Sequence, residues 1–195
     1  MKKNINKNIK KNKNQGFTLV EILISVTILV MIFSIVSGLF FSALQSQRRS
    51  LSLQSLLKEV SYAMEYMSRQ LRMTQKDDIG CTALDPLEYK NYATTVSSIK
   101  FRSYHEDPQC LEFFLETGSN RLKAKRTITA PSEDYLTSEN IIVESFNIIV
   151  EGDEPSDETQ PKVTISLKAR AKGAKQESQP EIQIQTTVSQ RNLDI

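Results

Sequence analysis

The sequence predicts an α+β protein in which one long N-terminal helix packs on an antiparallel β-sheet. Residues 17–44 are almost uncharged, and residues 53–71 continue with apolar side chains at steps of three and four, the spacing of one helical face. From Asp77 onward, short segments with alternating apolar side chains are separated by turn residues, a pattern typical of strands buried on one face. The length of 195 residues suits one such helix and one modest globular domain.

The chain begins with a basic leader. Residues 1–16 contain no acid and six lysines: Lys2, Lys3, Lys7, Lys10, Lys11 and Lys13. Without these six, 19 of the 25 basic residues remain against 23 acidic ones, so the rest of the chain is near −4. Nucleic-acid-binding proteins usually gather basic residues on their folded part, so this distribution does not favour nucleic acid as a partner.

An apolar segment follows the leader directly. Residues 22–41 alone supply the roughly twenty residues that a helix needs to cross about 30 Å of hydrocarbon. The positive-inside rule keeps the lysines in the cytoplasm and sends everything after Leu44 across the membrane. We therefore expect a single-pass protein of the cytoplasmic (inner) membrane, with lipid around residues 17–44 and the C-terminal domain outside.

A cleavable secretory signal peptide is the main alternative for this segment, because it also begins with lysines and continues with an apolar run. Its apolar region usually has only about 7 to 15 residues, which is shorter than the run found here. Residues 36–38 and 42–44 fit its small-residue cleavage site only weakly. A retained helix is the better interpretation.

Glu21 is the exception within the apolar run. A carboxylate costs up to about 2.5 to 3.5 kcal/mol at mid-bilayer and less near the interface. Either its side chain reaches the cytoplasmic boundary or it has a partner. The surrounding sequence from Lys13 to Val26, KNQGFTLVEILISV, resembles the cleavage and methylation motif of type IV prepilins.

The resemblance combines the basic leader with Gly16 at the last leader position, Phe17 at the first mature position and Glu21 at the fifth. It implies a pilin-like fold, cleavage by prepilin peptidase between Gly16 and Phe17, and N-methylation of the Phe17 amine. It also implies that Glu21 pairs with the N-terminal amine of an adjacent subunit during filament assembly. Pairing would lower the cost of both charges in hydrocarbon.

Two further segments, 65–72 and 185–195, are similar to minor pilin-like proteins, nearest to J-type pseudopilins of type II secretion and W-type minor pilins. The resemblance implies a non-enzymatic minor subunit of a type IV pilus or type II secretion pseudopilus. Its partners would be prepilin peptidase, other pilin or pseudopilin subunits and an inner-membrane assembly platform. Two alternatives stay open, namely a pilus-tip module that binds DNA or a surface ligand, and an anchored domain that does not polymerise.

Four regions are expected along the chain: the leader at 1–16, the transmembrane half of the helix at 17–44, its amphipathic half at 45–75, and a loop and sheet domain at 76–195. Gly38 within the helix marks either a point of bending or a close helix contact. The expected strands are Ser98–Tyr104, Cys110–Glu116, Arg121–Ile128, Ile141–Val150, Lys162–Ala169 and Glu181–Val188, with a hairpin turn at 117–120.

Cys81 and Cys110 both follow the apolar run, on the side expected to lie outside, where thiols oxidise. They predict a disulfide, with two small apolar side chains as the alternative. The single His105 gives neither a zinc site nor a catalytic constellation, and no metal or cofactor is expected. Residues 151–158 hold five acids, but they lack EF-hand spacing, so a solvated loop is favoured over a calcium site.

Overall fold

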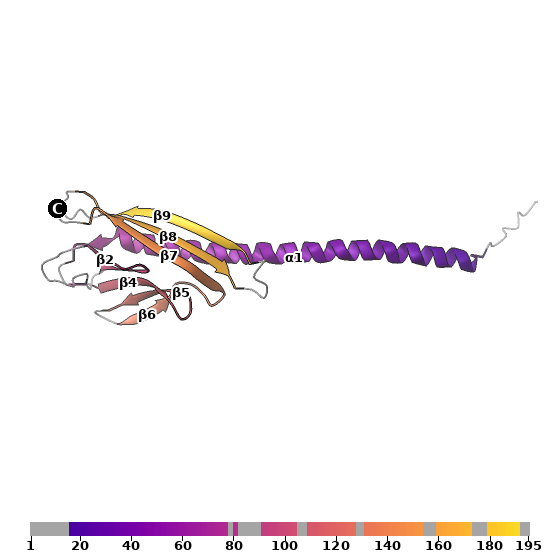
Figure 1. Cartoon of the computed structure of the whole chain (residues 1–195), viewed down its shortest axis with the longest axis horizontal. Coiled ribbons are helices and arrows are strands. Elements are labelled where there is room, and N and C mark those ends of the chain that lie inside the picture. Colours follow the sequence, from indigo (N-terminus) through magenta and orange to yellow (C-terminus); the bar gives the residue numbers. More distant parts are fainter. Residues whose placement is uncertain are drawn as a thin grey trace, which may run out of the picture. The chain divides into compact units, whose positions relative to one another are not determined.

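The computed structural model describes residues 16–77, 80–81, 91–104, 109–127, 131–153, 159–172 and 179–191. The chain divides into two compact units, Met1–Ser46 and Gln47–Ile195. A long N-terminal helix with antiparallel sheets confirms the predicted α+β class. In chain order (Figure 1) the elements are α1 (Leu19–Arg72), β1 (Thr74–Gln75), β2 (Tyr92–Thr94), β3 (Ser98–Ser103), β4 (Gln109–Glu116), β5 (Arg121–Arg126), β6 (Ser132–Tyr135), β7 (Ile141–Glu151), β8 (Lys162–Ala171) and β9 (Glu181–Ser189).

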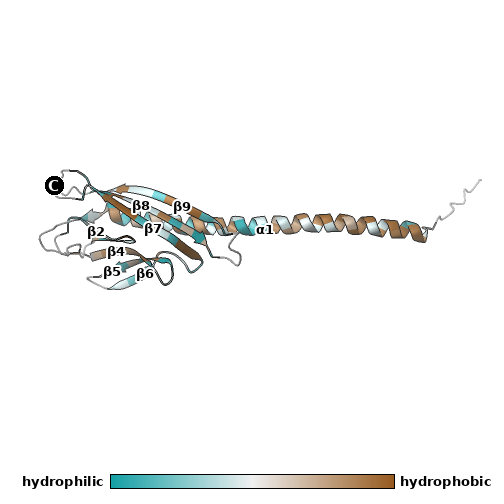
Figure 2. Cartoon of the chain, in the orientation of Figure 1, coloured by the Kyte–Doolittle hydropathy of each residue, from teal (hydrophilic) through white to brown (hydrophobic). Residues whose placement is uncertain are grey.

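The first unit contains the apolar half of α1. From Leu19 to Ser46 every side chain is exposed except that of Leu44, which is intermediate. Figure 2 shows this half coloured almost throughout as hydrophobic. The helix has no proline, and Gly38 does not interrupt it. It is long and apolar enough to cross a membrane.

The second unit is built on the other half of α1. The helix buries one stripe of side chains at steps of three and four, as the sequence predicts. It ends at Arg72 rather than at position 75, because Thr74 and Gln75 pair as β1 with Ser103 and Arg102. The buried helical residues are Leu56, Val60, Ala63, Met64, Met67 and Leu71.

Two antiparallel sheets complete the core of the second unit. One sheet has the order β1-β3-β4-β5-β6, with β2 also paired to β3, and the other has the order β7-β8-β9. Their strands alternate between buried and less buried side chains, and one face of each sheet joins the helical stripe in a single hydrophobic core. Among the largest fully buried side chains are Phe101, Phe113, Phe146, Ile165 and Leu167.

All six expected strands are present, to within two residues at each end. The structure also contains β1, β2 and β6, and it has two sheets where the sequence suggested one. The first two strands have only two and three residues, and β6 has no buried side chain, so none of them shows a period of two. Periodicity reports which face of a strand is buried and does not report which strands pair, so it cannot reveal a division into two sheets.

The predicted disulfide is present. Cys81 and Cys110 are bonded, with their Cα atoms 5.4 Å apart, and both are buried. The bond ties the segment after α1 to β4. The expected turn at 117–120 also forms, with Asn120 at a φ of 51°. His105 and residues 154–158 of the acidic loop lie outside the described residues.

Candidate functional site

The helix begins with a cap formed by Thr18. The Glu21 N–H donates to Thr18 Oγ1 at 3.3 Å and to the Thr18 carbonyl at 3.1 Å. A threonine followed three residues later by glutamate is the sequence pattern of a capping box, in which a side chain satisfies a helix N–H that has no partner in the helix. Thr18 therefore fixes where helical structure starts.

Glu21 lies in the first turn of α1. A negative charge there is favoured by the helix dipole, typically by about 0.3 to 1 kcal/mol at an exposed site. Its side chain is exposed, and the described part of the chain offers its carboxylate no hydrogen bond or ion pair. In an apolar environment this carboxylate needs a positive partner from elsewhere.

Gly16 and Phe17 precede the cap in a non-helical, exposed conformation. A Cβ added at Gly16 would meet no atom within 4 Å, and the φ of Gly16 is not among the positive ones. Nothing in the described part of the chain therefore requires glycine at this position.

The hydroxyl groups in the apolar half of α1 bond to the helix itself. Ser25 Oγ donates to the Glu21 carbonyl at 2.7 Å, Thr27 Oγ1 to the Ile24 carbonyl at 2.7 Å, and Ser34 Oγ to the Val30 carbonyl at 2.8 Å. Such bonds satisfy the hydroxyls without water. From Ile22 to Gln47 the helix contains no charged residue, so this half is suited to hydrocarbon or to a bundle of similar helices.

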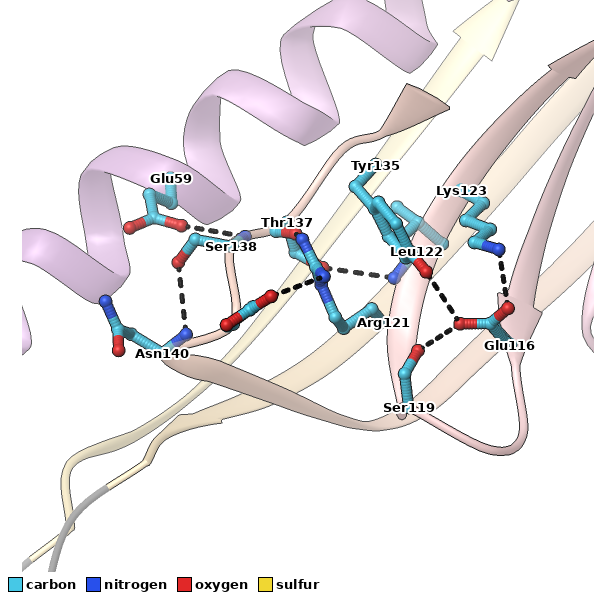
Figure 3. A network of polar contacts seen from close by, with 11 residues as sticks. Glu59, Glu116, Ser119, Arg121, Leu122, Lys123, Tyr135, Thr137, Ser138 and Asn140 are labelled. Carbon is cyan, nitrogen blue, oxygen red and sulfur yellow. Dashed lines mark hydrogen bonds and ion pairs between the residues drawn. The ribbon is translucent and has the colours of Figure 1, made fainter. Parts of the chain in front are cut away.

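A polar network in the second unit links α1 to the sheets (Figure 3). The Ser138 N–H donates to a Glu59 carboxylate oxygen at 3.2 Å, and the Leu122 N–H donates to Thr137 Oγ1 at 3.1 Å. Arg121 donates to the Thr137 carbonyl from Nε at 3.0 Å and from Nη2 at 2.8 Å. These bonds fix the connection between β6 and β7 against α1 and β5.

Beside this network, Glu116 pairs with Lys123 across the β4–β5 hairpin at 2.5 Å and also accepts a bond from Ser119. The bond from Lys123, and after it the one from Ser119, lowers the pKa of Glu116 below its ordinary value, and the Glu116 carboxylate raises the pKa of Lys123. A general acid or base works best with a pKa near the working pH. Both pKa values move away from neutral pH, which favours a structural role for this pair.

The described part of the chain contains no group of three or more His, Cys, Asp or Glu side chains placed to hold a metal ion. The N-terminal segment presents an exposed Gly16–Phe17 peptide bond and, at Glu21 in the first turn of α1, an exposed carboxylate.

Sequence reasoning selected Gly16, Phe17 and Glu21, which the structure places at the start of α1. It did not select Thr18, although the spacing from Thr18 to Glu21 carries the capping-box signal. It also did not find the Glu59–Ser138 contact. These two residues are 79 positions apart, and local patterns give no information on such a pairing.

Residues 11–38 match the family described as the prokaryotic N-terminal methylation motif. This range contains the Gly16–Phe17 bond, the Thr18 cap, Glu21 and much of the apolar half of α1. No curated protein and no solved structure matches the chain.

Proposed function

We propose, from the premise that the N-terminal segment is the methylation motif of type IV prepilin-like proteins, that the chain is a non-enzymatic subunit of a type IV pilus or type II secretion pseudopilus. The motif indicates a substrate of prepilin peptidase. The observation that carries the proposal is the order of features at the start of α1. An exposed Gly16–Phe17 bond precedes a capped helix whose third residue is Glu21.

The cleavage site is the Gly16–Phe17 bond. An exposed, non-helical segment is accessible to a peptidase, whereas a helical one would first have to unwind. Because glycine at position 16 has no role within the described structure, we assign its role to the peptidase, which would accept a residue without a side chain there. Cleavage removes the leader at 1–16, and the same enzyme then methylates the Phe17 amine.

Assembly uses the charge that cleavage creates. The new Phe17 amine is positive, and Glu21 is negative without a described partner. Burying either charge alone in hydrocarbon is costly. Pairing Glu21 with the amine of an adjacent subunit lowers both costs, so it would set the axial register of each subunit entering the filament.

The apolar half of α1 would be covered first by membrane lipid and then, after assembly, by the helices of the filament. Residues 17–44 would lie in the inner membrane before assembly, with the leader lysines in the cytoplasm and the amphipathic half at 45–75 and the loop and sheet domain at 76–195 outside. The assembly platform would then transfer the subunit into a bundle of similar helices. Within this proposal the chain is a minor subunit.

The test is the intact mass, with N-terminal fragmentation, of the protein taken from native membranes. A chain that begins at N-methylated Phe17 is the expected result. A chain that retains Met1 to Gly16, or one cut near Gly38 or Leu44, would contradict the proposal. Gly16→Val should block cleavage, whereas Glu21→Gln should leave cleavage intact and abolish recovery in sheared filaments.

A further inference from the structure

Strand β9 forms an open edge of the second sheet. It is the last strand in the order β7-β8-β9, and β8 is the only described strand with which it pairs. Its register with β8 runs without a shift from Lys162↔Ser189 to Arg170↔Glu181, whereas the β7–β8 ladder shifts between Val143 and Ser145. The edge is therefore regular over nine residues.

The hydrogen bonds at both ends of β9 fix which backbone groups are open. The Ala171 N–H donates to the Pro180 carbonyl at 3.0 Å, and the Gln190 N–H donates to the Pro161 carbonyl at 3.1 Å. Because bonded residues alternate along an antiparallel pair, even-numbered residues of β9 bond to β8. The N–H and C=O groups of Glu181, Gln183, Gln185, Thr187 and Ser189 point away from it.

This edge lacks the features that usually protect edges, such as lysine, internal proline, a bulge or short length. Glu181 is its single charged residue. The other described edge strands differ. β7, at the other edge of the same sheet, carries Glu144 and Glu151 and has a register shift between Val143 and Ser145. β6 has four residues and exposes Glu133 and Asp134, and β1 and β2 have only two and three residues. An added strand would meet a long, neutral edge at β9 alone among the described strands.

The inner face of β9 is also incompletely covered. Ile182 and Ile184 pack against the hydrophobic core but are only partly buried, whereas Val163, Ile165 and Leu167 of β8 are buried. One more strand beside β9 would cover the two isoleucines. Burial of apolar surface and new backbone hydrogen bonds would then act together, as in recognition by strand addition.

We propose that the open edge of β9 binds an extended strand of a different subunit of the same assembly, running antiparallel to β9. This inference rests on the proposed function. The partner strand would be uncharged, with apolar β-branched side chains facing Ile182 and Ile184 and polar ones opposite Gln183 and Gln185. Charged side chains there would find no described counter-charge between Gln183 and Ser189 on β9.

A second copy of the chain fits the edge less well. Two antiparallel β9 strands centred on Gln185 would match in register, with Gln183 opposite Thr187. However, β9 runs in the same direction as the second half of α1 (Figure 1), and the Arg191 N–H donates to the Arg72 carbonyl at their shared end. Antiparallel self-pairing would place the two Gln47 ends at opposite ends of the pair, which two copies anchored in one membrane cannot adopt.

The test is residue-resolved amide hydrogen exchange of the full chain, in detergent micelles and in filaments sheared from cells. In micelles we expect fast exchange at Gln183, Gln185 and Thr187 and slow exchange at Ile184 and Thr186. In filaments, the three fast amides should slow by at least about tenfold, which an added hydrogen-bonded strand would cause. Gln185→Lys should remove this protection. The control is Ser166→Lys, which introduces a lysine at the residue that pairs with Gln185 on the inner strand β8, and it should keep the protection.

Three outcomes would overturn the inference, and they separate it from the proposed function. A chain absent from sheared filaments overturns both. A chain present in filaments with fast exchange at Gln183, Gln185 and Thr187 overturns the edge site alone. A disulfide between two Gln185→Cys copies in membranes would assign the edge to a second copy and overturn the assignment to a different subunit.

Discussion

The two halves of α1 differ in what covers their apolar side chains. Both carry apolar side chains, but the first half has them all round and exposes them, whereas the second half gathers them on one stripe that the sheets cover. Phe33 is 63% exposed and Phe113, in the sheet that covers the second half, is 0% exposed. One half of the helix thus receives its covering from its own chain, and the other must receive it from outside.

A matched pair of substitutions gives the largest contrast between these regions. Phe113→Ala should lower the free energy of unfolding of the domain by about 3 to 5 kcal/mol, because it empties a buried aromatic site. Phe33→Ala should leave that free energy unchanged. Chemical denaturation of the full chain in micelles, followed by near-UV circular dichroism of the domain tyrosines, measures both. Equal losses would contradict the division of the helix.

Breaking the disulfide should have the next largest effect. Cys81→Ser with Cys110→Ser should lower the free energy of unfolding by about 2 to 4 kcal/mol, because the bond restricts the unfolded chain between positions 29 residues apart. The same denaturation measurement applies. Reduced wild-type protein is the control and should show a similar loss, while the helicity of residues 19–46 stays unchanged.

The cap at the start of α1 should matter locally. Thr18→Val should cost about 1 kcal/mol in helix stability at its first turn, because the Glu21 N–H loses its side-chain acceptor. Thr18→Ser should retain the cap. Faster amide exchange at Glu21 in the valine variant, with unchanged exchange in the core of the domain, is the expected observation. Equal exchange rates in both variants would contradict the capping role.

The smallest expected effect is a pH dependence confined to the second unit. Folding lowers the pKa of Glu116 from its ordinary value of 4.5, chiefly through its bond from Lys123. The Glu116–Lys123 pair therefore stabilises the fold above pH 4.5. This contribution is lost as the pH falls through the lowered pKa of the folded state. Glu116→Gln should flatten the decrease of Tm below about pH 4.5. Glu139→Gln, at a more exposed acid 3.8 Å from Arg121, is the control and should change the slope less.

The sequence predicted the elements whose side chains repeat along the chain. The stripe from Leu56 to Leu71 and the alternation of β8 identify their own structures, because burial imposes periods of 3.6 and two. Strands such as β6 have no buried face, so their sequences show no alternation of apolar side chains. A short sequence motif contains Gly16, Phe17 and Glu21, and for this reason they could be predicted as site residues. The same motif contains Thr18, which could have been predicted in the same way.

The parts that could not be predicted depend on contacts distant along the chain. Glu59 meets Ser138, and Arg126 Nη2 donates to Tyr66 Oη at 3.1 Å, and both contacts join the helix to the sheet region. Neither has a local pattern. The division into two sheets and the open edge of β9 have the same origin, because pairing between strands follows from the packing of the whole domain.

The Cys81–Cys110 bond also affects how the chain would respond to mechanical tension. If the proposed filament came under load, force applied to α1 would pass from Arg72 into the segment that follows it and would extend the chain as far as β4. The bond to Cys110 closes that segment into a covalent ring, so the residues between the two cysteines cannot lengthen. Force must instead act on β4 at the centre of its sheet, where ladders to β3 and β5 resist it together.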